Sequence, residues 1–215
     1  MSEDIFQTKF NIPTDIYVVA PGPNGLAHIE RIPDDAFIIV VNKAIELPLK
    51  PMLWLCAEPT VAKTDWFKEN YDVNKHIACF WKEYLGESYP GIAYYWNKEE
   101  PVLLEHHWHP IPFVLRRRAT ITGQAVQLAY WLGRPEPLLT PPPPPLVKRI
   151  ILCGFDAKGN TYYDDTFAGE GESLKLRARE WYWVTGFMNR IVKWMEENGT
   201  KVDSLSKTVL DVEVI

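Results

Sequence analysis

The chain has 215 residues, of which 47% are hydrophobic and 24% charged, a size and balance that suit one well-buried domain better than two. Its formal charge of -5 argues against a general electrostatic grip on nucleic acid, which needs a basic face. The sequence contains no run of about 18 apolar residues and no apolar stretch typical of a signal peptide, so we expect a cytoplasmic protein without a membrane span.

Short apolar runs, bounded by turn residues, predict the strands. Runs of this kind, without strict alternation, are typical of parallel strands that are covered on both faces. The predicted strands are residues 16–20, 36–42, 52–57, 76–81 and 149–156, with 200–205 as a final edge strand. Cys56, Cys79 and Cys153 each lie in such a run and lack a CxxC spacing, so we expect reduced core residues.

Two longer segments predict helices. Apolar residues recur every three or four positions over residues 121–133 and 173–198, with Gly133 closing the first and Gly199 following the second. Strands and helices in alternation predict the α/β class, with a single doubly wound, mostly parallel, Rossmann-like sheet and helices on both faces. We expect one nucleotide-binding-like domain over residues 1–215.

A Pro-rich connector at residues 140–146 contains five consecutive prolines, which favour an extended polyproline II rod. We interpret it as a surface connector. Docking into a partner's proline-binding groove is the alternative.

The turn APGPNGL, at residues 20–26, follows the first predicted strand. It contains neither the GxGxxG nor the GxxxxGK pattern of common nucleotide sites. Glycine lets a ligand approach the backbone closely, and exposed N–H groups bind phosphate, so we interpret the turn as the phosphate or nucleotide edge of a pocket. A plain tight turn is the alternative.

Five segments occur in a recognisable order: GPN at 22–24, RIPDDAFIIVVNKA at 31–44, LCAEP at 55–59, TITGQAVQLAYWLG at 120–133 and RIILCGFDAKGNTYYDD at 149–165. This pattern resembles the bacterial sialyltransferases that modify lipooligosaccharide. Their wider superfamily includes motility-accessory-factor-like proteins and archaeal hydroxymethyl-dihydropterin diphosphokinases. The resemblance implies a transferase that binds a nucleotide or nucleotide-sugar at the carboxyl ends of parallel strands.

The resemblance also implies which residues bind the substrate. Pro21 departs from it, because the family has an Asn there, and Glu58 stands where the family has an Asn before Pro. The residues at the family's substrate-binding positions, Glu58 in place of an Asn, are Gly22, Pro23, Asn24, Asn42, Glu58, Thr120, Thr122, Tyr162 and Tyr163.

A base must deprotonate the acceptor hydroxyl, and the family uses a His between the late strand and the last helix. This chain has no His after His109. We therefore expect Asp156, two residues after Gly154 at the end of the late strand, to be the catalytic carboxylate. Asp164, Asp165, Glu170 and Glu172 are further acids in this region, for which a solvated loop is the alternative.

Two charged clusters precede the central helix. Arg118, with Arg116 and Arg117, suits a diphosphate or carboxylate clamp, with a solvated basic cluster as the alternative. The segment EHHWHP at 105–110 fits a polar surface loop, acid/base chemistry or, with no standard zinc spacing, a metal site.

Two alternatives to the sugar transferase remain. One is an ATP- and magnesium-dependent diphosphokinase, in which Asp156 and Glu58 face the divalent cation. The other is a non-catalytic binding protein that keeps the fold. Aromatic residues on the last helix would suit a homo-oligomer contact.

Overall fold

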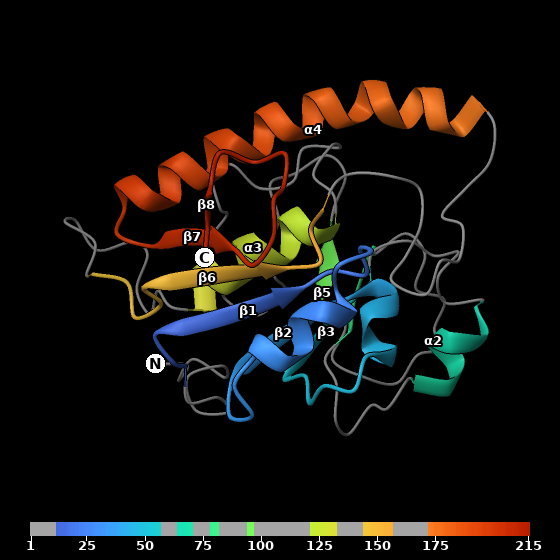
Figure 1. Ribbon diagram of the computed structural model, residues 1–215, viewed down its shortest axis with the longest axis horizontal. Coiled ribbons are helices and arrows are strands. Elements are labelled where there is room, and N and C mark those ends of the chain that lie inside the picture. Colours follow the sequence, from blue (N-terminus) through green and yellow to red (C-terminus); the bar gives the residue numbers. More distant parts are fainter. Residues whose placement is uncertain are drawn as a thin grey trace.

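The computed structural model of the chain describes residues 12–56, 64–70, 78–81, 94–96, 121–132, 144–156 and 172–215. At its centre is an eight-stranded sheet in the order β5-β4-β3-β2-β1-β6-β7-β8, and every neighbouring pair is parallel (Figure 1). The strands are β1 (Asp15–Val19), β2 (Phe37–Val41), β3 (Leu53–Leu55), β4 (Ala78–Trp81), β5 (Tyr94–Trp96), β6 (Arg149–Cys153), β7 (Lys201–Ser204) and β8 (Glu213–Val214). The predicted α/β class with a parallel sheet is confirmed.

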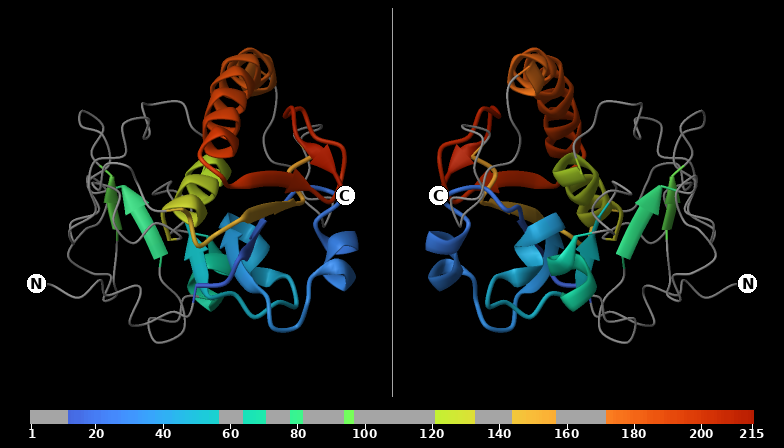
Figure 2. Two further views of the ribbon diagram at one scale, coloured as in Figure 1. Left: turned by 90° about the vertical axis from the view of Figure 1, so that its left-hand side faces the viewer. Right: turned by 90° about the vertical axis from the view of Figure 1, so that its right-hand side faces the viewer.

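Helical segments cover both faces of the sheet (Figure 2). On one face lie α3 (Ile121–Leu132) and α4 (Glu172–Glu197), whose rings Tyr130 and Trp194 are 5.1 Å apart between centroids. The other face is covered by the short 3-10 helices η1 (Leu26–Arg31) and η2 (Asn42–Glu46) and by α2 (Asp65–Asn70). The sheet is therefore doubly wound, as its sequence pattern predicts.

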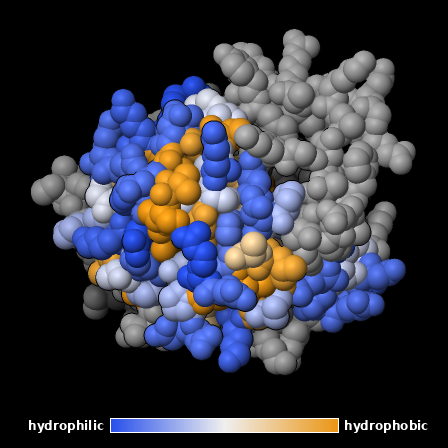
Figure 3. Space-filling model, in the orientation of Figure 1, coloured by the Kyte–Doolittle hydropathy of each residue, from blue (hydrophilic) through white to orange (hydrophobic). Residues whose placement is uncertain are grey.

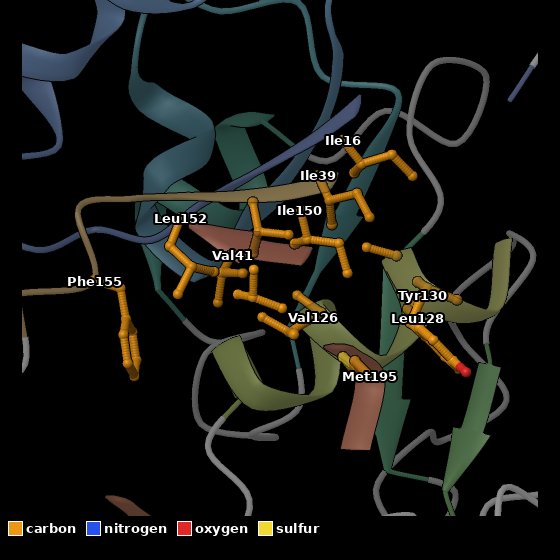
Figure 4. Close-up of a cluster of buried hydrophobic side chains, with 14 of the residues drawn as sticks. Ile16, Ile39, Val41, Val126, Leu128, Tyr130, Ile150, Leu152, Phe155 and Met195 are labelled. Atoms are coloured by element: carbon orange, nitrogen blue, oxygen red, sulfur yellow. The ribbon is translucent and has the colours of Figure 1, made fainter. Parts of the chain in front are cut away.

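The apolar runs form strands because both of their faces are buried. Along β1, Ile16 and Val18 point to the face of α3 and α4, whereas Tyr17 and Val19 point to the opposite face. Figure 4 shows the first of these two layers, in which Ile16 and the neighbouring strand residues pack over Val126 of α3. A strand buried on both sides has no position where a polar residue is favoured, which explains the absence of alternation in the sequence.

One prediction about the sheet edge is wrong. The strand expected at 200–205 forms as β7, but β8 pairs with its outer side, so β7 is an inner strand. Two residues are too few for a sequence signal. Val214 and Ile215 are 53% and 38% exposed, and Figure 3 shows an apolar area among hydrophilic residues on this side of the molecule. The shortness of β8 and its charged Glu213 limit pairing of this edge with other strands.

The late strand β6 stops at Cys153, three residues before its predicted end, because Gly154 takes a φ of 66°, which no regular strand contains. Cys153 and Cys56 lie buried in the core, as expected, and burial raises the pKa of the Cys153 thiol to about 12. The side chain of Cys79 lies outside the described part of the chain. Of the Pro-rich connector, only the end at residues 144–146 is described, and Pro145 is buried there.

Candidate functional site

The sheet reverses its strand order between β1 and β6. The chain runs outward from β1 to β5, returns through α3 to place β6 on the other side of β1, and then continues to β8 (Figure 1). In open α/β sheets, ligands bind beyond the carboxyl ends of the strands at such a switch. The turn after β1 and the segment after β6 both lie at this edge.

Two glycines join the turn to the end of β6, and we call their contact the glycine clasp. The backbone N–H of Gly22 donates to the carbonyl of Gly154 over 3.0 Å. A Cβ on Gly22 would lie 2.0 Å from that carbonyl oxygen, and one on Gly154 would lie 2.3 Å from the carbonyl of Ala20. Both glycines are therefore required because two backbone segments approach each other closely. This contact, and not the expected approach of a ligand, explains the glycine at position 22.

The N–H groups of the turn are already bonded within the chain. Gly22 donates to Gly154, Asn24 donates to Oδ2 of Asp156 over 2.8 Å, and Gly25 donates to the carbonyl of Gly22 over 2.8 Å. Pro23 has no N–H. Residues 22–25 therefore have no backbone donor left for a phosphate, and the expected phosphate cradle at this turn is replaced by a turn bonded to its own chain.

Asp156 receives three hydrogen bonds from two other strand ends. Besides the Asn24 backbone, the Nδ2 of Asn24 donates to Oδ1 over 2.8 Å, and the Oγ of Ser206 donates to the same oxygen over 2.7 Å. The Asp156 residue is only 4% exposed. We call Asn24, Asp156 and Ser206 the Asp156 network. Hydrogen bonds to a charged acceptor are stronger than neutral ones, so this network ties the ends of β1, β6 and β7 together.

His28 also contacts the glycine clasp, at Gly154. The backbone N–H of Gly154 donates to Nδ1 of His28 over 3.0 Å, and the imidazole is buried. Burial lowers the pKa of His28, against the opposing charge of Asp156 and together with that of Arg31. A neutral imidazole with an unprotonated Nδ1 is what the contact requires.

Asn42 lies at the carboxyl end of β2, next to β1 in the sheet. Its φ of 47° is in the left-handed region, and it is the one residue other than glycine in that region among the described ranges. Its carbonyl accepts from the indole N–H of Trp54 over 3.0 Å. Its side-chain Oδ1 is buried and, within the described chain, accepts no hydrogen bond. Strain and an unsatisfied polar atom together are typical of a functional position.

Thr122 is the second residue of α3 and is buried. Because α3 leads into the parallel strand β6, it runs back across the sheet and begins at the carboxyl edge. Asn42 and Thr122 thus share the edge with the Asp156 network, but no hydrogen bond joins either to Asp156 in the described part of the chain. The predicted site residues Glu58, Arg118, Thr120, Tyr162 and Tyr163 lie outside the described residues, as do Glu105, His107 and His109.

Sequence reasoning missed His28 and Ser206. Ser206 carries a weak signal, since it is a polar residue directly after the last predicted strand and therefore belongs to the carboxyl edge. His28 carries none, because an isolated His in a helix after a turn is compatible with any environment.

Among the described residues, no three His, Cys, Asp or Glu side chains come close enough to hold a metal ion. Asp156, a candidate cation ligand of the diphosphokinase alternative, has its oxygens turned toward three hydrogen-bond donors, whose hydrogens would face a cation there. None of the helices in the described ranges combines the length and the apolar character needed to cross a bilayer. Comparisons with protein-family models, curated proteins and solved structures find no match to this chain.

Proposed function

We propose that the chain is a transferase that binds a nucleotide or nucleotide-sugar at the carboxyl edge of the sheet, beside β1, β2 and β6. The observation that carries the proposal is the convergence of Asn24, Asp156 and Ser206, which are far apart in the sequence, at the switch between β1 and β6. Ligands of doubly wound sheets bind at this switch, beyond the carboxyl ends of the strands, and the network brings polar side chains to that place. Fold alone does not carry the assignment, since the same architecture hosts many activities.

In such a transfer, the acceptor hydroxyl forms a bond to the sugar carbon as the bond from that carbon to the nucleotide phosphate breaks. The phosphate keeps the electron pair, and the hydroxyl proton passes to a base. Amide and hydroxyl donors beside the leaving phosphate stabilise its growing charge. Asn42 has a strained backbone and an unsatisfied buried Oδ1, an acceptor, so it is our first candidate for contact with a hydrogen-bond donor of the nucleotide.

The contacts of Asp156 support a positioning role, because a base needs an oxygen that reaches the acceptor and this carboxylate holds three donors of its own chain. The prediction that Asp156 is the catalytic base stays a prediction. A second candidate function, the magnesium-dependent diphosphokinase, gains no specific support from these contacts.

Calorimetry and thermal shift with CMP, CDP, UDP, GDP and ATP, each with and without magnesium, test the proposal. A ligand that binds only the folded state stabilises it by about 2.7 kcal/mol at a hundred times its dissociation constant. We expect CMP to act without magnesium. Preferential binding of ATP with magnesium would favour the diphosphokinase. If none of the nucleotides binds or stabilises the protein, a non-catalytic protein is favoured.

The variant Asn42→Gly removes the side-chain amide while keeping a residue that accepts the positive φ, so its folding is preserved. We expect it to abolish most of the CMP stabilisation. Asn70→Gly is the matched control, since Asn70 is also partly exposed and its amide donates to the Trp66 carbonyl within α2. Equal CMP stabilisation of wild type and Asn42→Gly would remove Asn42 from the proposed site.

A further inference from the structure

Asp156 fixes the direction of the hydrogen bonds around it. An ionised carboxylate only accepts, so the amide nitrogen of Asn24 must face it, as the 2.8 Å contact from Nδ2 to Oδ1 has it. The Oδ1 of Asn24 then points away from the carboxylate. The single hydroxyl proton of Ser206 is likewise directed at Asp156 Oδ1, so its Oγ offers only lone pairs to any other group.

The outward side of the Asp156 network therefore presents acceptors. The side chains of Asn24 and Ser206 are neighbours, because the Asn24 nitrogen and the Ser206 oxygen lie 2.8 Å and 2.7 Å from the same Asp156 oxygen. Asn24 is exposed and Ser206 is partly exposed, so a ligand can reach them. The turn beside them contributes no backbone donor, since the N–H groups of Gly22, Asn24 and Gly25 are bonded internally.

A negative carboxylate with two outward acceptors repels an anion and attracts hydrogen-bond donors. We infer that the Asp156 network binds hydroxyl groups of a sugar, and that the phosphate of the ligand lies elsewhere along the edge. Two neighbouring acceptors suit a vicinal pair of hydroxyls. The identity of the ligand as a nucleotide or nucleotide-sugar rests on the proposed function, and the hydroxyls belong either to the ribose or to the transferred sugar.

Amide NMR titration of the full chain separates these sources. The probes are cytidine, 2′,3′-dideoxycytidine, a methyl hexoside and inorganic phosphate, and the observed signals are the side-chain amide of Asn24 and the backbone amide of Ser206. We expect cytidine to shift both signals, dideoxycytidine to lose about tenfold in affinity through the missing hydroxyls, and phosphate to leave both signals in place.

Shifts from the hexoside without shifts from cytidine would assign the hydroxyls to a sugar other than ribose, support the inference, and count against nucleotide binding at this edge. If neither sugar shifts the two signals, or if phosphate does, the inference is overturned. A third result separates the two proposals. If CMP and its dideoxy analogue bind with equal affinity and the hexoside shifts neither signal, the proposed function stands and the inference alone is overturned.

Two substitutions in one loop sharpen the test. Ser206→Ala removes one acceptor and should weaken cytidine binding several-fold while leaving dideoxycytidine binding unchanged, and Ser206→Thr, which keeps the hydroxyl, should restore it. Lys207→Ala removes the exposed cation next to Ser206 and should leave cytidine binding unchanged. If Lys207→Ala weakened binding more than Ser206→Ala, the loop would be an anion site and the inference would fail.

Discussion

Gly22 donates its backbone N–H to the carbonyl of Gly154 over 3.0 Å, and a Cβ on Gly22 would lie 2.0 Å from the same oxygen. The first strand end and the late strand end are thus held at a separation that only glycine allows. We expect Gly22→Ala to lower the free energy of unfolding by about 1 to 3 kcal/mol, the usual cost of forcing an atom into a filled space. Urea titration of the purified variant measures this loss.

Gly186 provides the control for this substitution. It lies inside α4, and a Cβ built there meets no atom within 4 Å. Because alanine is the better helix former, Gly186→Ala should raise the free energy of unfolding by about 0.5 to 1 kcal/mol. Losses of the same size in both variants would mean that the clasp contributes nothing specific at Gly22.

Asp156→Asn tests the charge at the centre of the network. In one orientation the new amide nitrogen faces the Asn24 backbone N–H and that hydrogen bond is lost, and in the other the Asn24 amide and the Ser206 hydroxyl must reverse to accept from it. In both orientations the charged acceptor is gone. We expect a loss of about 1.5 to 3 kcal/mol in unfolding free energy, the range for bonds to a charged group. The exposed Asp34, changed to Asn, is the control and should differ from wild type by less than about 0.5 kcal/mol. Equal stability of the two variants would contradict a structural role for the Asp156 charge.

The strands β1, β2, β3 and β6 could be predicted from the sequence because each is an apolar run that is buried on both faces, whereas β5 is not among the predicted strands. Ile16 to Val19 lie in such a run, and each of their side chains enters one of the two core layers. The pattern fails for β8, whose two residues carry no periodic signal. The apolar pattern also contains no information on strand order, so it could not predict that β7 lies inside the sheet.

Part of the site could be predicted for the same reason, since polar residues after apolar runs belong to the carboxyl edge. That argument reaches Asn24, Asn42 and Asp156. It does not reach their bonding, because Asn24 and Asp156 are 132 residues apart, and Asp156 and Ser206 are 50 apart. Only the pairing of β6 with both β1 and β7 brings them into contact. The contacts of His28 and of the turn with residues 154 and 156 were not predicted for the same reason, since they too join residues far apart in the sequence.

His28 should make the clasp sensitive to acid. Its pKa is lowered in the folded chain by burial, with Arg31 acting in the same direction and Asp156 opposing, so the unfolded chain binds the proton first as pH falls. The contribution of His28 is complete above its ordinary pKa near 6.5 and is lost as pH falls below that value, at no more than about 1.4 kcal/mol per pH unit. Urea titrations from pH 7.5 to pH 5 measure the slope.

The variant His28→Asn isolates that slope. An asparagine Oδ1 can accept from the Gly154 N–H as Nδ1 of His28 does, but it does not titrate in this range. The difference in unfolding free energy between wild type and variant should therefore shrink or change sign toward pH 5. Parallel curves for the two proteins would show that His28 has the same pKa in the folded and unfolded chains.

Lys201 holds a buried carboxylate at the far side of the sheet. Its Nζ lies 3.1 Å from Oδ1 of Asp203, which is fully buried, and 2.7 Å from Oε2 of Glu213, which is 64% exposed. An exposed ion pair contributes little, whereas a buried charge that loses its partner is costly. We expect Lys201→Met to destabilise the fold more than Glu213→Gln in urea titrations. Adding Asp203→Asn to Lys201→Met should recover part of the loss, because it removes the unpaired charge. If the double variant were no more stable than Lys201→Met, the loss would come from the packing of the lysine side chain and not from the buried charge.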